Sequence, residues 1–273
     1  MSKRRGPNIG AVRLYHRFTS KPTAEIYVGD ALAFLKSLKS GSAHIVFLDP
    51  PFNLGKNYGT LAPDSKPGDS YAAWLATILA EAVRVLADGG ALYLYHLPSW
   101  AIRVAGQLNA SLTFQHWIAI SMKNGFVRGR RLYPAHYALL FYTKGRAMNL
   151  NRPKLPVEYC ECGRTKKDYG GYRHIVEEHG LNLSDIWEDI SPVRHRRTKR
   201  RAANELPQKL TDRVVAISGG KGLVFVDPFA GGGSAVLSAA KANMTIKACD
   251  LIDDYAAIQV AALEQLKSVR GER

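Results

Sequence analysis

The sequence predicts an α/β protein with a doubly wound, mostly parallel sheet. Short apolar runs alternate with amphipathic stretches from residue 24 onward, with an interruption between about residues 146 and 202. A glycine-rich turn joins one of the apolar runs to the helix that follows it. Strands separated by helices favour a parallel sheet covered on both faces. Because 46% of the 273 residues are hydrophobic, the chain can bury a large core, which excludes a wholly disordered basic tail.

The first half of the pattern is interrupted by a rigid turn. Strands are expected at 24–30, 43–48, 91–95, 115–121 and 135–143, and helices at 31–39 and 71–86. Two successive prolines, Pro50 and Pro51, follow the second of these strands. Neither can continue a strand ladder or a helix interior, so the chain must turn directly after Asp49.

The second half repeats the pattern after a polar stretch. Helices are expected at 208–218, 234–242 and 253–269, and strands at 222–226 and 244–249. The polar stretch lacks the alternation and is interpreted as an insertion. The chain therefore divides into a basic N-terminal arm (1–23), a first half (24–145), the insertion (146–202) and a second half (203–273).

The charge of the chain indicates a polyanionic partner. The chain carries 38 Lys+Arg against 23 Asp+Glu, a formal charge of +15, which favours nucleic acid or an anionic membrane surface. No apolar run approaches the roughly 18–20 residues that span a bilayer, and no apolar signal core follows the basic N-terminus. Neither a membrane partner nor secretion is therefore expected. Three cysteines, Cys160, Cys162 and Cys249, cannot form a closed set of disulfides, which favours the reducing cytoplasm.

The glycine-rich turn has the geometry of a ligand site. Gly231-Gly-Gly-Ser234 follows a strand and opens a helix, so its backbone N–H groups would face a ligand that glycine lets approach closely. Asp250 ends the next strand, where a carboxylate can accept hydrogen bonds from ribose hydroxyls. The dinucleotide pattern G-x-G-x-x-G is not matched because Val236 occupies the third glycine position. A nucleoside without a pyrophosphate is the favoured ligand, and a merely tight loop is the alternative.

The turn after the strand at 43–48 carries a second candidate site. Asp49-Pro-Pro-Phe52 places a carboxylate and an aromatic ring on a rigid turn. Asp49 and the carbonyl of Pro50 could accept hydrogen bonds from a planar amine while Phe52 stacks on its ring. The alternative is a turn with a helix-capping Asp and a core Phe.

These two motifs carry a family resemblance. Asp49-Pro-Pro-Phe52 and Asp227-Pro-Phe-Ala-Gly-Gly-Gly-Ser234 resemble the catalytic and cofactor motifs of the amino-group DNA methyltransferases, which act on adenine N6 or cytosine N4. Their order, with the catalytic motif first, resembles the permuted beta group over residues 24–145 and 203–268. The resemblance implies a seven-stranded-type methyltransferase fold, S-adenosyl-L-methionine as cofactor and a flipped base in double-stranded DNA as substrate. It makes 24–145 the catalytic half and 203–273 the cofactor-binding half.

The identity of the target base is left with alternatives. An initial Asp in the four-residue motif resembles adenine enzymes, whereas Ser resembles cytosine enzymes, so adenine N6 is favoured over cytosine N4. A noncatalytic DNA-binding module on a methyltransferase frame is a further alternative. A nicotinamide-dependent oxidoreductase fits neither the glycine pattern nor the charge.

The resemblance also implies roles for individual residues. Catalytic roles fall on Asp49, Pro50, Pro51 and Phe52. Cofactor contacts fall on Asp30, Lys209, Asp227, Phe229, Ala230, Gly231, Gly233, Ser234 and Asp250. Within this set, Asp30 would lie near the adenine, Asp250 at the ribose, and Lys209 in the segment that encloses the methionine moiety. His136 would flank the base pocket, with a satisfied strand-end histidine as the alternative.

The insertion ends in a dense basic run. Its six positive charges are Arg194, Arg196, Arg197, Lys199, Arg200 and Arg201. Beside a base pocket, contact with DNA phosphates is favoured over a merely solvated run, and Arg130 and Arg131 would extend the same surface. The insertion is the expected target-recognition region. The family leaves room for a homodimer and for a cognate restriction endonuclease.

The insertion also contains four residues that suit zinc. Cys160, Cys162, His174 and His179 have the spacing C-x-C-x₁₁-H-x₄-H, and a structural Zn²⁺ could order a segment without its own core. C-x-C is tight for two ligands of one ion. The alternative is two reduced surface cysteines and two solvated histidines.

Overall fold

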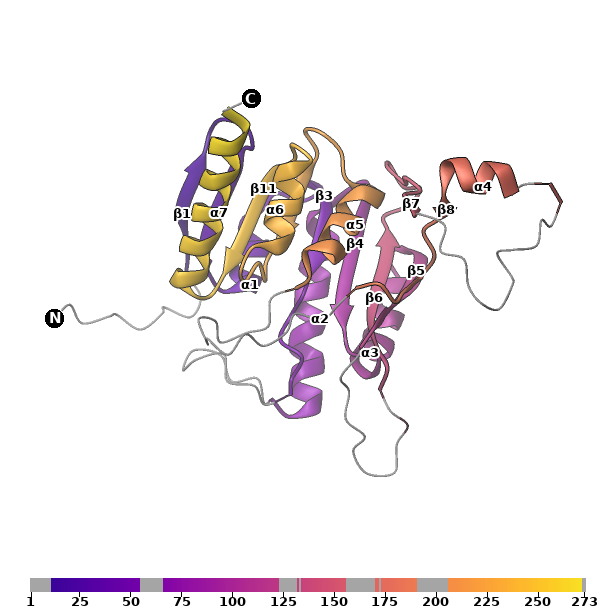
Figure 1. Ribbon diagram of the computed structural model, residues 1–273. Helices are drawn as coiled ribbons and strands as arrows, with labels where there is room; N and C mark the ends of the chain where they lie inside the picture. The colour runs from indigo at the N-terminus through magenta and orange to yellow at the C-terminus, as the bar shows by residue number, and fades with distance from the viewer. Residues whose placement is uncertain are drawn as a thin grey trace.

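The computed structural model describes residues 11–54, 66–122, 132, 134–155, 170–171, 173–190 and 206–271, and it has the predicted α/β architecture (Figure 1). In chain order the elements are β1 (Val12–Phe18), β2 (Ala24–Gly29), α1 (Ala31–Ser37), β3 (Ala43–Leu48), α2 (Gly68–Val85), β4 (Leu86–His96), α3 (Pro98–Asn109), β5 (Thr113–Ser121), β6 (His136–Thr143), β7 (Lys154–Leu155), α4 (Arg173–His179), β8 (Leu181–Asn182), β9 (Ile186–Trp187), α5 (Gln208–Ser218), β10 (Val224–Asp227), α6 (Ser234–Lys241), β11 (Thr245–Asp250) and α7 (Asp253–Gly271).

The main sheet is mostly parallel, as predicted. Its nine described strands have the order β1-β2-β11-β10-β3-β4-β6-β5-β9. The run from β2 through β11, β10 and β3 to β4 is parallel throughout. β6 is antiparallel to both of its neighbours, and β1 is antiparallel to β2 at the edge. β7 and β8 form a separate antiparallel pair.

Helices cover both faces of this sheet. α1, α2 and α3 pack on one face, and α5, α6 and α7 pack on the other (Figure 1). β3 alternates between the two layers: Ile45 and Phe47 pack with α5–α7, and Val46 and Leu48 pack with α1–α3. All four side chains are at most 1% exposed, which agrees with the unbroken apolar run at residues 45–48 of the sequence. Within the described ranges, no helix has the length and apolar character needed to cross a bilayer.

The structure contains elements that the sequence analysis did not predict. β1 occupies residues 12–18 of the expected N-terminal arm and pairs with β2. α3 begins at Pro98, whose missing N–H is harmless in a first helical turn, and buries Ala101, Val104 and Leu108. β9 lies inside the expected insertion but pairs with β5 in the main sheet. The division into four segments stays a prediction, and these contacts tie parts of the arm and the insertion to the common core.

A partly buried ion pair joins Asp189, in the expected insertion, to Arg213 of α5. Arg213 Nη1 and Nη2 donate to the two carboxylate oxygens of Asp189 at 2.7 and 2.5 Å, and the guanidinium lies 5.3 Å from the ring centre of Trp187. The Arg213 side chain is only 8% exposed, and Lys209 also pairs with Asp189. The hydrogen bonds from Arg213 hold the pKa of Asp189 well below its ordinary value.

We expect Asp189→Ala to lower the free energy of unfolding by about 1–2 kcal/mol at pH 7. Loss of one partner from a fully buried pair costs about 3–5 kcal/mol. Because Asp189 is 39% exposed, solvent screens the pair and the expected cost is smaller. A lowered carboxyl pKa stabilises the fold above the ordinary pKa of 3.8, and this stabilisation is lost as the pH falls through the folded-state value.

Urea unfolding of the two proteins across pH measures this effect. The matched control is Asp185→Ala, because Asp185 is 53% exposed and only approaches His116 at 3.6 Å. Equal losses of stability in the two variants at pH 7 would contradict a special role for the Asp189–Arg213 pair.

Candidate active site

The two sequence motifs lie at the carboxyl ends of neighbouring parallel strands. β3 ends directly before Asp49, β10 ends at Asp227, and the two strands pair side by side. The chain leaves β3 towards α2 on one face of the sheet and leaves β10 towards α6 on the other. Such a reversal is a topological switch point, where α/β proteins bind ligands in the crevice beyond the strand ends. The fold therefore brings together two motifs that lie in opposite halves of the sequence.

Further polar side chains end strands along the same edge. Asp30 follows β2, Asp250 ends β11 and His96 ends β4. The sheet order places the strand ends of Asp30, Asp250, Asp227, Asp49 and His96 in line. The four acidic residues were predicted for the site, whereas His96 was not.

The glycine turn is shaped by left-handed backbone and by Asp250. Gly231 has φ 48° and Gly233 has φ 84°, conformations that favour glycine. The N–H of Gly231 donates to Asp250 Oδ2 at 2.9 Å, and Gln259 Nε2 donates to the Gly231 carbonyl at 2.9 Å. A Cβ on Gly231 would have no neighbour closer than 3.9 Å, so this side of the turn is open, whereas one on Gly233 would lie 2.9 Å from Gln259 Cγ. A ligand could therefore approach the backbone of the turn closely at Gly231.

Burial alters the acidity of the two carboxyl groups beside this turn. Burial raises the pKa of Asp250 to about 6, although the N–H groups of Ile252 and Gly231 oppose the shift. Burial also raises the pKa of Asp227, which is 2% exposed, well above its ordinary value, and the charges of Asp49 and Asp250 add to the effect. Asp227 Oδ1 also accepts the N–H of Phe229 at 3.0 Å. Asp250 therefore changes its charge near pH 6.

Asp30 has a helix-capping contact. Its Oδ1 accepts the N–H of Ala33 at 2.9 Å, which satisfies a first-turn donor of α1. The carboxylate lies at the end of β2, next to β11 in the sheet. Its predicted contact with a cofactor stays a prediction.

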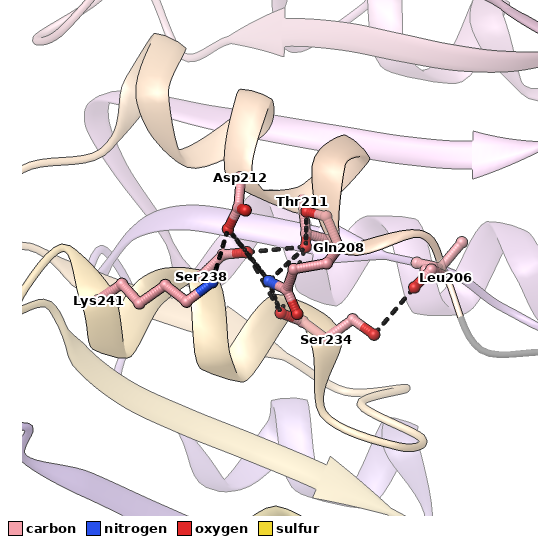
Figure 2. A network of polar contacts seen from close by, with 7 residues as sticks. All are labelled: Leu206, Gln208, Thr211, Asp212, Ser234, Ser238 and Lys241. Carbon is pink, nitrogen blue, oxygen red and sulfur yellow. Dashed lines mark hydrogen bonds and ion pairs between the residues drawn. The ribbon is translucent and has the colours of Figure 1, made fainter. Parts of the chain in front are cut away.

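A polar network joins the first turn of α6 to α5, as Figure 2 shows. Ser234 Oγ donates to the Leu206 carbonyl at 2.9 Å, and Gln208 Nε2 donates to the Ser234 carbonyl at 3.0 Å. Ser238 Oγ donates to Asp212 Oδ1 at 2.7 Å one turn further along. This network fixes the helix that follows the glycine turn against α5.

The structure pairs Lys209 with Asp189, a residue of the expected insertion. Although Lys209 lies in the first turn of α5, its ammonium group forms an ion pair with Asp189. It also lies 3.4 Å from the Asp189 carbonyl. Its predicted role at the methionine moiety therefore competes with this contact and stays a prediction.

Phe52 lies against a wall of aromatic rings. Its ring centre is 4.9 Å from that of His96 in a stacked arrangement, 5.7 Å from Tyr95 and 5.8 Å from Tyr137. Burial, and then the charge of Asp49, raise the pKa values of Tyr95 and Tyr137. The carboxylate, Phe52 and the two tyrosines therefore form one aromatic site with a negative charge.

His136 was predicted beside the base pocket, but its neighbour Tyr137 makes the contact with Phe52. Successive side chains of a strand point to opposite faces of the sheet. Tyr137 packs with the α5–α7 layer and Ala138 with the α1–α3 layer, so His136 shares the face of Ala138. The alternation of β6 could have identified Tyr137 if the orientation of the strand had been known.

Asn53, which directly follows Asp49-Pro-Pro-Phe52, connects this turn to the segment before α2. It adopts φ 56°, a left-handed conformation that asparagine tolerates better than most residues. Its side chain exchanges two hydrogen bonds with the backbone of Lys66, at 2.9 and 2.7 Å. The chain after Phe52 is thereby tied to the segment that leads into α2.

Several predicted residues lie outside the described part of the chain. These are Arg130, Arg131, Cys160, Cys162, Arg194, Arg196, Arg197, Lys199, Arg200 and Arg201. His174 and His179 lie on α4, where His179 Nε2 approaches Glu178 at 3.8 Å. The described residues contain no cluster of three or more metal-ligating side chains. The zinc site and the phosphate contacts stay predictions.

Comparisons with known proteins identify the family. The family model described as DNA methylase (N6_N4_Mtase) matches residues 43–261. Over 212 residues the chain is 41% identical to the type II methyltransferase M.BamHI of Bacillus amyloliquefaciens, covering 77% of this chain and 50% of that protein. It is 26% identical over 259 residues to the DNA adenine methyltransferase YhdJ of Escherichia coli (strain K12), covering 88% of this chain and 87% of YhdJ.

A solved structure shares the fold. The cytosine-N4-specific PvuII DNA methyltransferase matches with a TM-score of 0.61 at 14% identity, covering 94% of this chain and 95% of that one. The chain spans about half the length of M.BamHI. The family match covers most of the chain and includes both motifs at the switch point. The chain belongs to the DNA methylase family of N6 and N4 amino-methyltransferases.

Proposed function

We propose that this chain transfers a methyl group from S-adenosyl-L-methionine to the exocyclic amino group of a base flipped out of double-stranded DNA. The observation that carries the proposal is the adjacency of the two motifs on β3 and β10 at the switch point. The hydrogen-bond acceptors and aromatic rings around Asp49-Pro-Pro-Phe52 and the glycine turn after β10 would then face the same crevice. Membership of the DNA methylase family supports this assignment.

The turn on β10 fits the cofactor. Gly231 is open on its Cβ side, and Asp250 ends the neighbouring strand where ribose hydroxyls can be bound. The residues proposed to hold the cofactor are those predicted from the motif, with Asp250 at the ribose and the turn from Asp227 to Gly233 along the nucleoside. When bound, the cofactor supplies a methyl group that its sulfonium already activates.

The turn on β3 fits an aromatic amine. The lone pair of such an amine is delocalised into its ring, so the amine is a poor nucleophile. Asp49 and the Pro50 carbonyl can accept its two N–H groups and favour tetrahedral geometry at nitrogen. Positioning and electrostatic stabilisation by these acceptors would supply most of the rate acceleration.

Phe52 is the proposed stacking surface for the flipped base. An amino group inside a duplex is inaccessible, and flipping the base costs a few kcal/mol. Stacking on an aromatic side chain returns about 1–3 kcal/mol per base. Because Phe52 already packs against His96, Tyr95 and Tyr137, it would lose little freedom when a base stacks on it.

Adenine N6 is the first candidate target, and cytosine N4 is the second. The initial Asp of Asp49-Pro-Pro-Phe52 favours adenine, and the relative YhdJ is an adenine methyltransferase. The second candidate rests on the acceptors themselves, because both amines present two N–H groups to Asp49 and the Pro50 carbonyl. The PvuII enzyme, which shares the fold, is cytosine-N4-specific.

The basic charge is proposed to serve DNA binding in the cytoplasm. We assign the run of residues 194–201 to phosphate contacts, which hold the duplex without reading its sequence. M.BamHI is a type II methyltransferase, and a cognate restriction endonuclease is part of the proposal for this chain. A homodimer is part of it as well.

A transfer assay tests the proposed function. The purified full chain is incubated with S-adenosyl-L-methionine carrying a tritiated methyl group and with DNA of mixed sequence. We expect the label to enter the DNA. DNA that binds the protein but acquires no label would instead indicate the noncatalytic DNA-binding module.

A further inference from the structure

Two buried polar residues contact Asp49-Pro-Pro-Phe52, which we call the catalytic turn, although neither belongs to this motif. Tyr71 of α2 is 2% exposed, and His96 at the end of β4 is fully buried. Tyr71 Oη lies 2.6 Å from His96 Nε2, and the same hydroxyl donates to the carbonyl of Pro51. The backbone N–H of Leu97 donates to His96 Nδ1 at 2.8 Å. The four groups form a continuous chain of hydrogen bonds.

The direction of each bond follows from the donors and acceptors. Because His96 Nδ1 accepts from the Leu97 N–H, the neutral ring must carry its proton on Nε2. Nε2 then donates to Tyr71 Oη, whose own proton goes to the Pro51 carbonyl. Burial lowers the pKa of His96 to about 3, which keeps the ring neutral at ordinary pH.

The catalytic turn has special need of such an anchor. Neither Pro50 nor Pro51 has an N–H, so at these two residues the main chain can be held only through its carbonyl oxygens. The Pro51 carbonyl belongs to the peptide plane that joins Pro51 to Phe52. Fixing this plane restricts the positions open to the Phe52 ring and to the preceding Pro50 carbonyl, and His96 also stacks directly on Phe52.

We propose that Tyr71 and His96 are positioning residues, which act through the Pro51 carbonyl to hold Asp49-Pro-Pro-Phe52 in the geometry that methyl transfer requires. This inference rests on the proposed function. It assigns to the site two residues from different elements that neither motif contains.

We call the hydrogen-bond chain from the Leu97 N–H through His96 and Tyr71 to the Pro51 carbonyl the relay. Three variants test it, because each one keeps a different part of this chain. Tyr71→Phe keeps the ring, which packs on Trp100 with ring centres 4.5 Å apart, and removes the hydroxyl. His96→Gln keeps an N–H donor at the position of Nε2 for Tyr71. His96→Asn keeps only an acceptor at the position of Nδ1 for the Leu97 N–H. Both His96 variants lose the imidazole: His96→Gln keeps the bond to Tyr71, and His96→Asn keeps the bond from the Leu97 N–H.

The relay predicts a ranking in the rate of methyl transfer. We expect Tyr71→Phe and His96→Asn to lower kcat about 10- to 100-fold, with the KM values for DNA and S-adenosyl-L-methionine nearly unchanged. His96→Gln should retain most of kcat. The double variant Tyr71→Phe/His96→Asn should be no slower than either single one, because both break the same chain. If kcat instead follows the unfolding free energy of each variant, or if His96→Gln and His96→Asn are equally slow, the relay is wrong.

A readout independent of activity separates this inference from the proposed function. Long-range ¹H–¹⁵N spectra report which nitrogen of a histidine ring carries the proton, and the signal absent from His96→Gln identifies His96. We expect Nε2–H in the wild-type protein from pH 5 to 8. An Nδ1–H ring overturns the relay whatever the activity. An Nε2–H ring in a wild-type protein that transfers no methyl group to DNA overturns the proposed function instead.

Discussion

Replacement of Asp49 by alanine is expected to lower the rate of methyl transfer to DNA by about 100- to 1,000-fold, the usual effect of removing one preorganised polar group from a transition state. The carboxylate follows β3 at the switch point and is the charged acceptor proposed for the target amine. Its loss would leave the amine nitrogen planar and poorly nucleophilic. The glycine turn follows β10, and its partner Asp250 ends β11, whereas Asp49 follows β3. Binding of S-adenosyl-L-methionine should therefore change little.

Two further variants make this test specific. Asp49→Asn keeps one acceptor oxygen and removes the charge, so it should be faster than Asp49→Ala and slower than the wild-type protein. Asp88→Ala is the matched control, because Asp88 is 95% exposed and contacts only the rim of the sheet through Lys144 at 3.5 Å. Rates are measured under single-turnover conditions with saturating cofactor. Wild-type turnover in Asp49→Ala would defeat the proposed catalytic role.

Replacement of Asp250 by alanine is expected to weaken binding of S-adenosyl-L-methionine by about 10- to 100-fold, the range for losing a hydrogen bond to a charged group. Asp250 is the proposed ribose ligand, and its two oxygens also accept the N–H groups of Gly231 and Ile252 at 2.9 and 3.0 Å. The substitution therefore removes a ligand and loosens the turn that holds the nucleoside. Calorimetry measures the affinity, with the exposed Asp254→Ala as control.

The same residue predicts a pH dependence of cofactor binding. Burial raises the pKa of Asp250 to about 6, so the carboxylate becomes a protonated, weaker acceptor below that pH. Affinity should fall about tenfold for each pH unit below 6, and Asp250→Ala should lose this dependence. A raised carboxyl pKa favours the folded protein below its ordinary value of 3.8, and this contribution is lost as the pH rises to 6. Protonation of Asp250 at pH 5 therefore does not destabilise the fold. A cofactor affinity that does not change with pH would exclude Asp250 as the ribose ligand.

The parallel core of the fold could be predicted because its signals are local. Its strands are mainly apolar, as in the run at residues 45–48, and β2, β3, β10 and β11 each end at or directly before an aspartate. β1 could not be found in this way, because only Phe18 of the strand is buried and its place depends on pairing with β2. α3 did carry a signal: Ala101, Val104 and Leu108 share a helical face after Pro98.

Some residues of the candidate site could likewise be predicted from the sequence, and others could not. The acidic residues and glycines were predicted because each motif is a short, continuous stretch at the end of one strand. Tyr71 and His96 could not be assigned to the site from the sequence, since their contacts with Pro51 and with each other exist only after α2 and β4 have packed beside β3. The choice between His136 and Tyr137 likewise required the orientation of β6 in the sheet.

Identification of the modified nucleoside is the direct test of amino-group methylation by this chain. Unmethylated DNA is incubated with the purified chain and S-adenosyl-L-methionine, digested to nucleosides and analysed by mass spectrometry against standards. We expect a methyl group on an exocyclic amine, with N6-methyldeoxyadenosine as the first expectation and N4-methyldeoxycytidine as the second. A methyl group on a ring carbon, or DNA that stays unmethylated by the wild-type chain while Asp49 and the glycine turn are intact, would contradict it.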